Sequence, residues 1–487
     1  MQVPGRPVPT TFESIEAIAL REPQRLALVQ DRQSWTYHAL YADLIRAVRV
    51  LAAQGVKRGD RVAVGTSGFQ AGLLLLVACE SLGAVTTSFL SQGDTDAQAV
   101  FSLVDWVFSD SEQEVPQSVR FVRIDEAFVA RIRSVDLADP TPLPRVALGP
   151  GEPQRISRTS GSSGRSKFMV LRRHAQEYWL DTAVATSGLR PDSQLLILGP
   201  LVINGSFARA SACLRIGAAA MSLQPHDVAA REVTHVAGLT TLIEELLEAL
   251  PASYAPRRPV TVFTVGGFLT PMLRQKIARV FQGPVVSRYG MNEVCGVCDN
   301  MDVNGIGLVS AGVDIRIVDE SGRDLPAGAL GIVAVRTPAM VDGYIDDPDA
   351  TQAAFREGWF YSGDWGTLVG HRLLRLAGRH DDLVNVGGIK IPANLMEQKV
   401  RELVAPDDCA VLATNLDGGN TTLGIALVMS PGEARQAVRQ RLAEGLHAGT
   451  TAGARVLFFD ELPRLPSGKI DRISLHRMFA APPSGSV

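Results

Sequence analysis

The residues best suited to chemistry lie in a short polar segment, residues 158–168, with the sequence RTSGSSGRSKF. Glycines let backbone N–H groups approach an anion, hydroxyl groups donate hydrogen bonds to phosphate oxygens, and a lysine supplies a positive charge. The spacing differs from that of a Walker loop, because Lys167 follows Gly164 by three residues. The composition therefore predicts a phosphate-binding loop of another type, with a solvated Ser/Gly-rich linker as the alternative.

Four further polar segments, each with a glycine, follow in order along the chain. They are SRYGMNE (287–293), YSGDWG (361–366), LAGRHDDLVNVGGIKIP (376–392) and ELPRLPSGKIDR (461–472). In the last of these, prolines and a Ser-Gly pair present Lys469 on a rigid turn. Taken singly, an acid such as Asp364 could cap a helix and the GRHDD charges could form a solvated turn. The ordered set instead indicates one site assembled from several loops.

Lysine is rare in this chain, and three of its lysines, Lys167, Lys390 and Lys469, fall within these segments. Only six are present, at positions 57, 167, 276, 390, 399 and 469, so arginine supplies nearly all the positive charge. A compact ammonium group on a flexible stem does what a planar guanidinium cannot. We therefore expect some of these lysines to be kept for a point charge rather than for solubility.

Composition and hydropathy describe the background of these segments. With 487 residues, 46% hydrophobic residues and a net charge of −3, the chain is expected to form more than one globular domain and to have no nucleic-acid partner. Five cysteines in so long a chain predict no disulfide framework, which fits the cytoplasm. We expect no signal peptide and no membrane span, because the longest apolar run, residues 71–85, is too short and contains Glu80.

Helical and strand patterns alternate along most of the chain. A helix is predicted over residues 37–56, ending at Gly55, then a strand within 60–66 and a buried helix over 71–82. Further strands are predicted at 194–200, 260–267 and 284–290, each ending at glycine or proline. This alternation predicts parallel sheets covered by helices, with functional loops at the carboxyl ends of strands. From about Gly305 the pattern changes to an antiparallel hairpin, and the segment from Gly378 onward predicts a small α+β unit.

Taken together, the motifs resemble those of the adenylate-forming superfamily: acyl- and aryl-CoA synthetases, adenylation domains of peptide synthetases, and luciferases. The resemblance covers nearly the whole chain, from SWTYHAL near the start to LPSGKIDR near the end. It implies a multi-layer α/β N-terminal AMP-binding domain with a distorted β-barrel subdomain over residues 1–377. It also implies a small, mobile α+β lid over residues 378–487 that carries the catalytic lysine.

The resemblance also implies a reaction and the residues that carry it out. A carboxylate attacks the α-phosphorus of ATP, pyrophosphate leaves, and a thiol then attacks the acyl-AMP. Lys469 and Glu293 would be catalytic, Glu293 as the ligand of Mg²⁺; Asp381 would be the hinge, and Gly387 and Gly388 would line the loop used in the thiol step. The residues that would bind ATP and AMP are Thr159, Ser160, Gly161, Ser162, Ser163, Gly164, Lys167, Gly266, Gly267, Phe268, Tyr289, Gly290, Met291, Asn292, Asp364 and Arg379.

The chain departs from the family pattern at several positions. Ser166 stands where proline is usual, Phe168 where glycine is usual, and Asn292 where threonine is usual, so Phe168 would either crowd or cover the loop. The segment LILGPLVINGSFA (196–208) lacks the aspartate that binds an α-ammonium group, which argues against an amino-acid substrate. The implied acyl pocket is lined by Ile203, Gly205, His235, Gly238, Cys295 and Cys298. The CGVC sequence could also bind zinc, but a single pair of cysteines is weak evidence for that.

The sequence thus predicts ATP- and Mg²⁺-dependent activation of a hydrophobic or aryl carboxylic acid, followed by transfer to coenzyme A. Two alternatives stay open: an acyl carrier protein as acceptor, and a non-catalytic nucleotide-binding relative. Retention of Lys167, Glu293, Asp364, Arg379 and Lys469 argues against the second. A luciferase-like oxygenase has no separate support, and a homodimer is compatible with the sequence.

Overall fold

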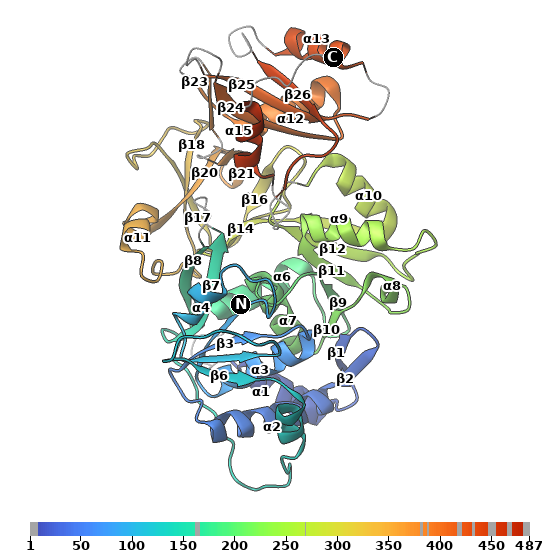
Figure 1. Cartoon of the computed structure of the whole chain (residues 1–487), viewed down its shortest axis with the longest axis vertical. Coiled ribbons are helices and arrows are strands. Elements are labelled where there is room, and N and C mark those ends of the chain that lie inside the picture. The colour runs from blue at the N-terminus through green and yellow to red at the C-terminus, as the bar shows by residue number, and fades with distance from the viewer. Residues whose placement is uncertain are drawn as a thin grey trace. The chain divides into compact units, whose positions relative to one another are not determined.

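The structure is a computed structural model that describes residues 8–160, 166–267, 269–379, 383–386, 389–415, 421–430, 434–446, 454–464 and 470–480 (Figure 1). The chain divides into two compact units, each described by itself. The first comprises Met1–Val303, Gly307–Asp314 and Arg336–Phe360. The second comprises Asn304–Ile306, Ile315–Val335 and Tyr361–Val487. A lid that begins at residue 378 stays a prediction, because the second unit also takes in earlier segments.

A seven-stranded sheet in the first unit has the strand order β13-β12-β11-β9-β10-β1-β2. Its neighbours are parallel except for β2, which runs antiparallel to β1. Parallel neighbours place their carboxyl ends at one edge, where ligands of α/β proteins bind. The strands are β1 (Leu26–Gln30), β2 (Gln33–Thr36), β9 (Gln194–Ile197), β10 (Ala219–Ser222), β11 (His235–Leu239), β12 (Val260–Val265) and β13 (Gln282–Ser287).

A second sheet of this unit has six strands in the order β6-β5-β3-β4-β7-β8. It is parallel except for β8, which returns antiparallel to β7. The strands are β3 (Arg61–Gly65), β4 (Val85–Ser88), β5 (Trp106–Ser109), β6 (Arg120–Arg123), β7 (Pro153–Ser160) and β8 (Ser166–Arg172). The predicted phosphate loop is therefore the connection of the β7–β8 hairpin.

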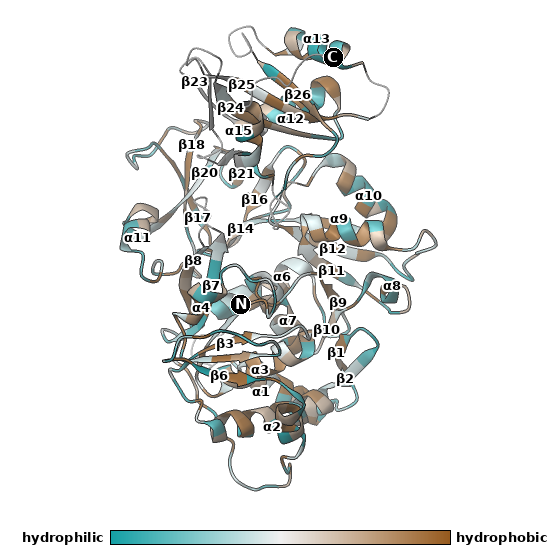
Figure 2. Ribbon diagram, viewed as in Figure 1, coloured by the Kyte–Doolittle hydropathy of each residue, from teal (hydrophilic) through white to brown (hydrophobic). Residues whose placement is uncertain are grey.

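Helices pack on both sheets and share a large apolar core with them. Figure 2 shows hydrophobic residues along α1, α3 and β3, and the core contains residues such as Phe12, Leu75, Phe108 and Phe263. The helices of the first unit are α1 (Thr11–Arg21), α2 (Tyr37–Gln54), α3 (Phe69–Ser81), α4 (Ala97–Phe101), α5 (Glu126–Arg133), α6 (Arg173–Ser187), α7 (Asn204–Ile216), α8 (Pro225–Val228), α9 (Thr240–Ala249), α10 (Pro271–Phe281) and α11 (Pro348–Ala354).

The predicted helix over residues 37–56 is confirmed as α2, which begins after Thr36 and ends at Gly55. The Thr36 side chain accepts a hydrogen bond from the Ala39 N–H, and Gly55 adopts the left-handed conformation with φ of 100°. The buried helix predicted over residues 71–82 is confirmed as α3, most of whose residues are buried. Among the described helices, none combines the length and the apolar character needed to cross a membrane.

Antiparallel strands follow the seven-stranded sheet. β14 (Tyr289–Met291) pairs with β15 (Cys295–Asp299), and β15 pairs with β16 (Ile306–Val309). β19 (Phe355–Arg356) pairs with the start of β20. In the second unit, β21-β20-β18-β17 is the strand order; the strands are β17 (Asp314–Val318), β18 (Gly331–Arg336), β20 (Trp359–Val369) and β21 (Leu373–Arg379). The hairpin predicted after Gly305 corresponds to β17 and β18, which are neighbours in the sheet.

The C-terminal part of the second unit has the predicted α+β character. β24 and β25 are antiparallel, β25 and β26 are parallel, and β22 pairs with β23. Helix α12 packs on this sheet through an apolar cluster that includes Val400, Val411 and Ile425. The elements are β22 (Leu383–Val386), β23 (Ile389–Pro392), α12 (Ala393–Val404), β24 (Asp408–Asn415), β25 (Thr421–Val428), α13 (Arg435–Gly445), β26 (Arg455–Phe459) and α15 (Arg472–Ala480).

Candidate active site

The β7–β8 hairpin positions the predicted phosphate loop. Thr159 pairs with Lys167, and Ser160 pairs with Ser166, so the two ends of the loop are held side by side. Gly161, Ser162, Ser163 and Gly164 lie outside the described residues. Thr159 and Lys167 stand directly opposite each other in the hairpin, and their contact with phosphate stays a prediction.

A group of four side chains, which we call the loop clamp, holds both ends of this loop: Asp94, Asp96, Arg158 and Ser166. Arg158 Nη2 lies 2.8 Å from Asp94 Oδ2, and Arg158 Nη1 lies 3.4 Å from Asp96 Oδ2. Ser166 Oγ donates a hydrogen bond to Asp96 Oδ2 at 2.6 Å. Burial opposes ionisation of Asp94, but hydrogen bonds from Arg158 and from the Leu90 N–H outweigh it and lower the pKa of Asp94 below its ordinary value.

We expect Asp96→Ala to raise the KM for ATP by about 10- to 100-fold, since charge-assisted hydrogen bonds contribute about 1.5–3 kcal/mol and the loop ends lose theirs. The melting temperature should fall only slightly, because the side chain is partly exposed. ATP-dependent pyrophosphate exchange measures the first effect and calorimetry the second.

A double-mutant cycle with Ser166→Ala provides the matched control for this prediction. Both variants remove the same hydrogen bond, so the double variant should be little worse than Asp96→Ala alone. Fully additive effects on the KM for ATP would show that Asp96 does not act through Ser166.

Glu293, Tyr344 and Lys167 come together beside the hairpin. Tyr344 Oη donates a hydrogen bond to Glu293 Oε1 at 3.0 Å, and Lys167 Nζ lies 4.8 Å from the centroid of the Tyr344 ring. Glu293 is only 5% exposed. Tyr344 is itself held against β8, because its backbone bridges to Met169 and the next residue, Ile345, donates its N–H to the Phe168 carbonyl at 2.7 Å.

Tyr344 was not among the residues predicted from the sequence. The available signal is the Gly343-Tyr344 pair before the turn-rich segment IDDP. A side chain at position 343 would lie 2.4 Å from Thr351, and Gly343 has φ of 154°, so glycine is required there. A glycine required at position 343 can indicate that the backbone holds the next aromatic side chain in one place. The sequence does not show that this side chain hydrogen-bonds to Glu293.

The arrangement of these residues suits a magnesium-bound polyphosphate. Carboxylate oxygens are ligands that Mg²⁺ prefers, and Mg²⁺ in such sites is held by one or two carboxylates together with phosphate oxygens. The carboxylate of Glu293 accepts a hydrogen bond from the Tyr344 hydroxyl, and the ammonium of Lys167 lies over the ring of the same tyrosine. The donor set therefore fits the predicted metal, with Glu293 as the ligand from the protein.

The structure resolves what Phe168 and Asn292 do. Phe168 is buried and packs with Phe89, Phe101 and Ile156 in the core of the six-stranded sheet, so its side chain belongs to that core. Asn292 Nδ2 donates a hydrogen bond to the Arg158 carbonyl at 2.6 Å. Asn292 thus joins the segment before Glu293 to β7, and its predicted contact with nucleotide stays a prediction.

Residues predicted to pack on adenine follow neighbouring strands. Gly266 and Gly267 follow β12, and Tyr289, Gly290 and Met291 form β14 just after β13. Because β12 and β13 are parallel neighbours, both segments leave the same edge of the sheet. Gly266 has φ of 84°, and a side chain there would lie 2.7 Å from Leu239. Phe268 lies outside the described residues.

Comparisons with known proteins place the chain in a family. Residues 15–345 match the family model described as AMP-binding enzyme. The chain belongs to the AMP-binding enzyme family. The predicted superfamily and α/β fold class are thereby confirmed, and so is the prediction of a ligase at the level of the family.

Several characterised proteins are similar to this AMP-binding enzyme. The medium-chain fatty-acid–CoA ligase of Escherichia coli (strain K12) is 25% identical, over 93% of this chain and 88% of that protein. The indoleacetate–CoA ligase of Aromatoleum aromaticum is 26% identical, over 96% and 98%. The solved structure of ATP-bound MatB from Rhodopseudomonas palustris has a TM-score of 0.83 at 22% identity, covering 96% and 98%. That last likeness shows a shared fold.

The second unit contains the other predicted nucleotide ligands of this AMP-binding enzyme. Asp364 on β20 pairs directly with Arg379 on β21. The Asp364 N–H donates a hydrogen bond to Ser362 Oγ at 3.1 Å. Their contact with ribose stays a prediction. The predicted catalytic Lys469, the hinge Asp381, and Gly387 and Gly388 lie outside the described residues.

The predicted acyl-pocket residues are only partly brought together. Ile203 and Gly205 lie at the start of α7, and Gly238 lies near the carboxyl end of β11. His235 instead begins β11 and contacts the Thr234 hydroxyl, with 2.7 Å between Nδ1 and Oγ1. His235 and Gly238 are therefore at different ends of one strand, and His235 does not share the carboxyl edge.

Cys295 and Cys298 are both buried on β15, and all five cysteines of the chain carry free thiols. Cys295 packs in an apolar cluster with Met169, Ala175 and Val341. Burial raises the pKa of Cys295 to about 11 and that of Cys298 to about 12, so both stay protonated near neutral pH. Among the described residues, no group of three or more histidine, cysteine or acidic side chains could hold a metal ion.

Asn204 lies in segment 196–208, in which the aspartate expected for an amino-acid substrate is missing. Its side chain is buried. Its Oδ1 accepts a hydrogen bond from Arg155 Nε at 3.1 Å. Arg155 also donates to Thr86, Ser88 and the Leu201 carbonyl, and burial lowers its pKa to about 10. The amide oxygen of Asn204 is therefore committed to Arg155.

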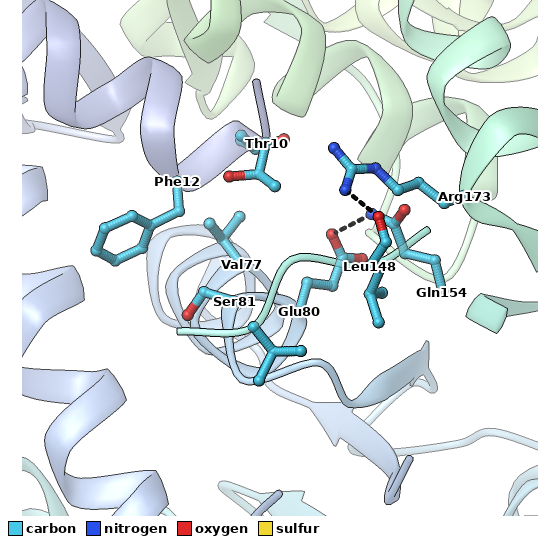
Figure 3. A pocket seen from close by; sticks show the side chains of 10 residues that line it. Thr10, Phe12, Val77, Glu80, Ser81, Leu148, Gln154 and Arg173 are labelled. Atoms are coloured by element: carbon cyan, nitrogen blue, oxygen red, sulfur yellow. Dashed lines mark hydrogen bonds between the residues drawn. The ribbon is translucent and has the colours of Figure 1, made fainter. Parts of the chain in front are cut away.

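A small pocket lined by part of the same polar network contains no predicted site residue. Figure 3 shows Glu80 and Gln154 pointing toward each other, and Gln154 Nε2 donates to Glu80 Oε2 at 3.1 Å. Burial raises the pKa of Glu80 above its ordinary value, while Arg155 acts in the opposite direction. Arg173 donates hydrogen bonds to the Leu148 and Val8 carbonyls. These contacts join α3 to β7, and α6 to the segments around Val8 and Leu148.

Proposed function

We propose that this AMP-binding enzyme converts a carboxylic acid, ATP and Mg²⁺ into acyl-AMP and pyrophosphate, and then transfers the acyl group to coenzyme A. The observation that carries the proposal is the convergence of Lys167, Tyr344 and Glu293 next to the ends of the phosphate loop. The family match supports it over most of the chain.

The chemistry of the first step follows from charge. The acid and ATP are both anions, so catalysis consists mainly of positioning and charge neutralisation. When bound, Mg²⁺ neutralises the phosphate oxygens that become pyrophosphate. Lys167 would hold the same oxygens as a point charge, and Glu293, oriented by Tyr344, would hold the metal. Lys469 would bridge the carboxylate and the α-phosphate, and movement about Asp381 would then admit the thiol past Gly387 and Gly388.

The acid is proposed to lack an α-ammonium group. The first residues of α7 provide no carboxylate, and Asn204 is committed to Arg155. Relatives are named for a medium-chain fatty acid, indoleacetate and ferulate. We therefore propose a hydrophobic or aryl carboxylic acid as the substrate class, and the cytoplasm as the compartment, consistent with five free cysteines.

Pyrophosphate exchange across a panel of fatty, aryl and amino acids tests the first half-reaction. We expect exchange that depends on Mg²⁺ and on an acid without an α-amino group. Adding coenzyme A or a phosphopantetheinylated carrier protein to the active mixture then identifies the acceptor. Thioester formed only on the carrier protein would replace coenzyme A as the acceptor, and the absence of exchange with every acid would favour a non-catalytic nucleotide-binding protein.

A further inference from the structure

Two buried arginines, Arg209 and Arg288, lie against the same aromatic ring in the first unit. The Cζ atom of Arg209 lies 4.2 Å from the centroid of the Phe263 ring, and that of Arg288 lies 5.9 Å from it. Arg209 is 8% exposed and the side chain of Arg288 is 7% exposed. The three residues come from α7, the segment after β13, and β12, so the chain brings both cations together through the fold.

The two guanidinium groups have too few partners for their burial. Arg209 Nη1 donates a hydrogen bond to the Gly205 carbonyl at 3.1 Å, and Arg209 Nε has no hydrogen-bond partner among the described residues. No acidic side chain in the described part of the chain forms an ion pair with Arg209. Arg288 Nε pairs with Asp299 Oδ1 at 2.5 Å, but Arg288 Nη2 also lacks a hydrogen-bond partner there.

The charge balance of this pair is unfavourable without a further anion. Of the two cations, only Arg288 pairs with a carboxylate, that of Asp299, and Ser310 Oγ also donates a hydrogen bond to that carboxylate at 2.6 Å. Burying an unpaired ion costs several kcal/mol, while a desolvated cation–π contact returns about 2 kcal/mol. Burial, followed by the nearness of Arg288, lowers the pKa of Arg209 to about 10. The group remains charged at neutral pH.

Glycines make the space for both guanidinium groups, beside residues that are predicted to line the acyl pocket. A side chain at position 205 would lie 3.0 Å from Arg209 Nη1, and one at position 296 would lie 2.2 Å from Arg288 Nη2. Gly205, at the first of these contacts, is a predicted pocket residue. Cys295, the residue before Gly296, is another, and the charges of Arg288 and Arg209 act on its thiol. The unpartnered donors therefore lie next to residues that are predicted to line the acyl pocket.

We propose that Arg209 and Arg288 bind a second carboxylate of the acid, so that the preferred substrate is an aliphatic or aryl dicarboxylic acid. The inference rests on the proposed function and specifies its substrate. A planar guanidinium matches a carboxylate with two parallel hydrogen bonds, and both arginines keep donors available for such contacts. One carboxylate of the acid is adenylated, and the other supplies the counter-charge that the two arginines lack.

Matched acids that differ only in the second carboxylate test this proposal. We compare glutarate with pentanoate, and isophthalate with benzoate, in pyrophosphate exchange by the full-length enzyme. Hydrogen bonds to charged groups contribute about 1.5–3 kcal/mol, so kcat/KM should favour the diacid by about 10- to 100-fold. In Arg209→Met this preference should disappear, while the KM for ATP stays unchanged. Arg209→Lys keeps the charge without the planar fork and should give an intermediate preference.

Direct binding separates failure of this inference from failure of the proposed function. Calorimetric titration with glutarate and with pentanoate measures binding whether or not exchange occurs, and circular dichroism checks that each variant is folded. If Arg209→Met is unfolded, Arg209→Lys carries the test alone. The assignment would be overturned if the unaltered enzyme used and bound mono- and dicarboxylic acids equally well. It would also be overturned if the preference for the diacid survived substitution of Arg209. Both outcomes can occur while acids are still adenylated.

Discussion

Lys469→Ala is expected to lower acyl-AMP formation by about 10³-fold and to leave thioester formation from preformed acyl-AMP within about threefold of the unaltered enzyme. By resemblance, this lysine neutralises the negative charge that develops between the attacking carboxylate and the α-phosphate. That charge exists only in the first half-reaction, so the second should not need the lysine. The prediction concerns a residue outside the described part of the structure and rests on the Ser467-Gly468-Lys469 motif.

Two assays distinguish the half-reactions. Pyrophosphate exchange reports acyl-AMP formation, and thioester release from synthetic acyl-AMP and coenzyme A reports the second step. Lys57, which is exposed and lies outside these motifs, provides a matched control: Lys57→Ala removes the same charge and should largely retain pyrophosphate exchange. Equal loss of both half-reactions in Lys469→Ala would mean that the two steps do not divide in this way.

Glu293→Gln should lower pyrophosphate exchange by about 10²- to 10³-fold and raise the Mg²⁺ concentration needed for half-maximal activity. The amide keeps the shape of the side chain and can still accept the hydrogen bond from Tyr344. It loses the negative charge that a hard cation requires. The measurement is exchange rate against Mg²⁺ concentration at saturating ATP.

Tyr344→Phe is the companion variant for this prediction. It removes one hydrogen bond to Glu293 and keeps the ring that faces Lys167, so the loss should be only about 3- to 20-fold. An unchanged Mg²⁺ dependence in Glu293→Gln, with activity retained, would exclude Glu293 as the metal ligand. A loss in Tyr344→Phe as large as that in Glu293→Gln would make the tyrosine a direct participant in the reaction.

The local features of this protein were readable from the sequence. Strands and helices with strong periodicity, such as α2 and α3, were predicted within a few residues because their signals come from neighbouring positions. The order of the polar motifs indicated the family for a similar reason. Lys167, Glu293, Asp364 and Lys469 are each recognised from the few residues around them.

Contacts between distant residues were beyond the reach of such patterns. Ser166 and Asp96 are 70 positions apart, and Tyr344 and Glu293 are 51 positions apart. Nothing in the residues around Asp96 or Tyr344 shows the partner. The place of His235 in the fold was not predicted for a similar reason. It lies close in sequence to the predicted pocket residue Gly238, but it begins β11, whereas Gly238 lies near the end of that strand.

The motif chemistry of this AMP-binding enzyme therefore follows from its sequence, because charge, hydroxyl content and turn preference belong to short segments. The partners of those motifs follow from the fold. Packing brings Asn204 to Arg155, buries Phe168 in the sheet core, and leaves Arg209 and Arg288 beside one aromatic ring, with a carboxylate paired to Arg288 alone. Burial and counter-charge depend on what surrounds a side chain in space, and this environment is set when distant strands and helices pack together.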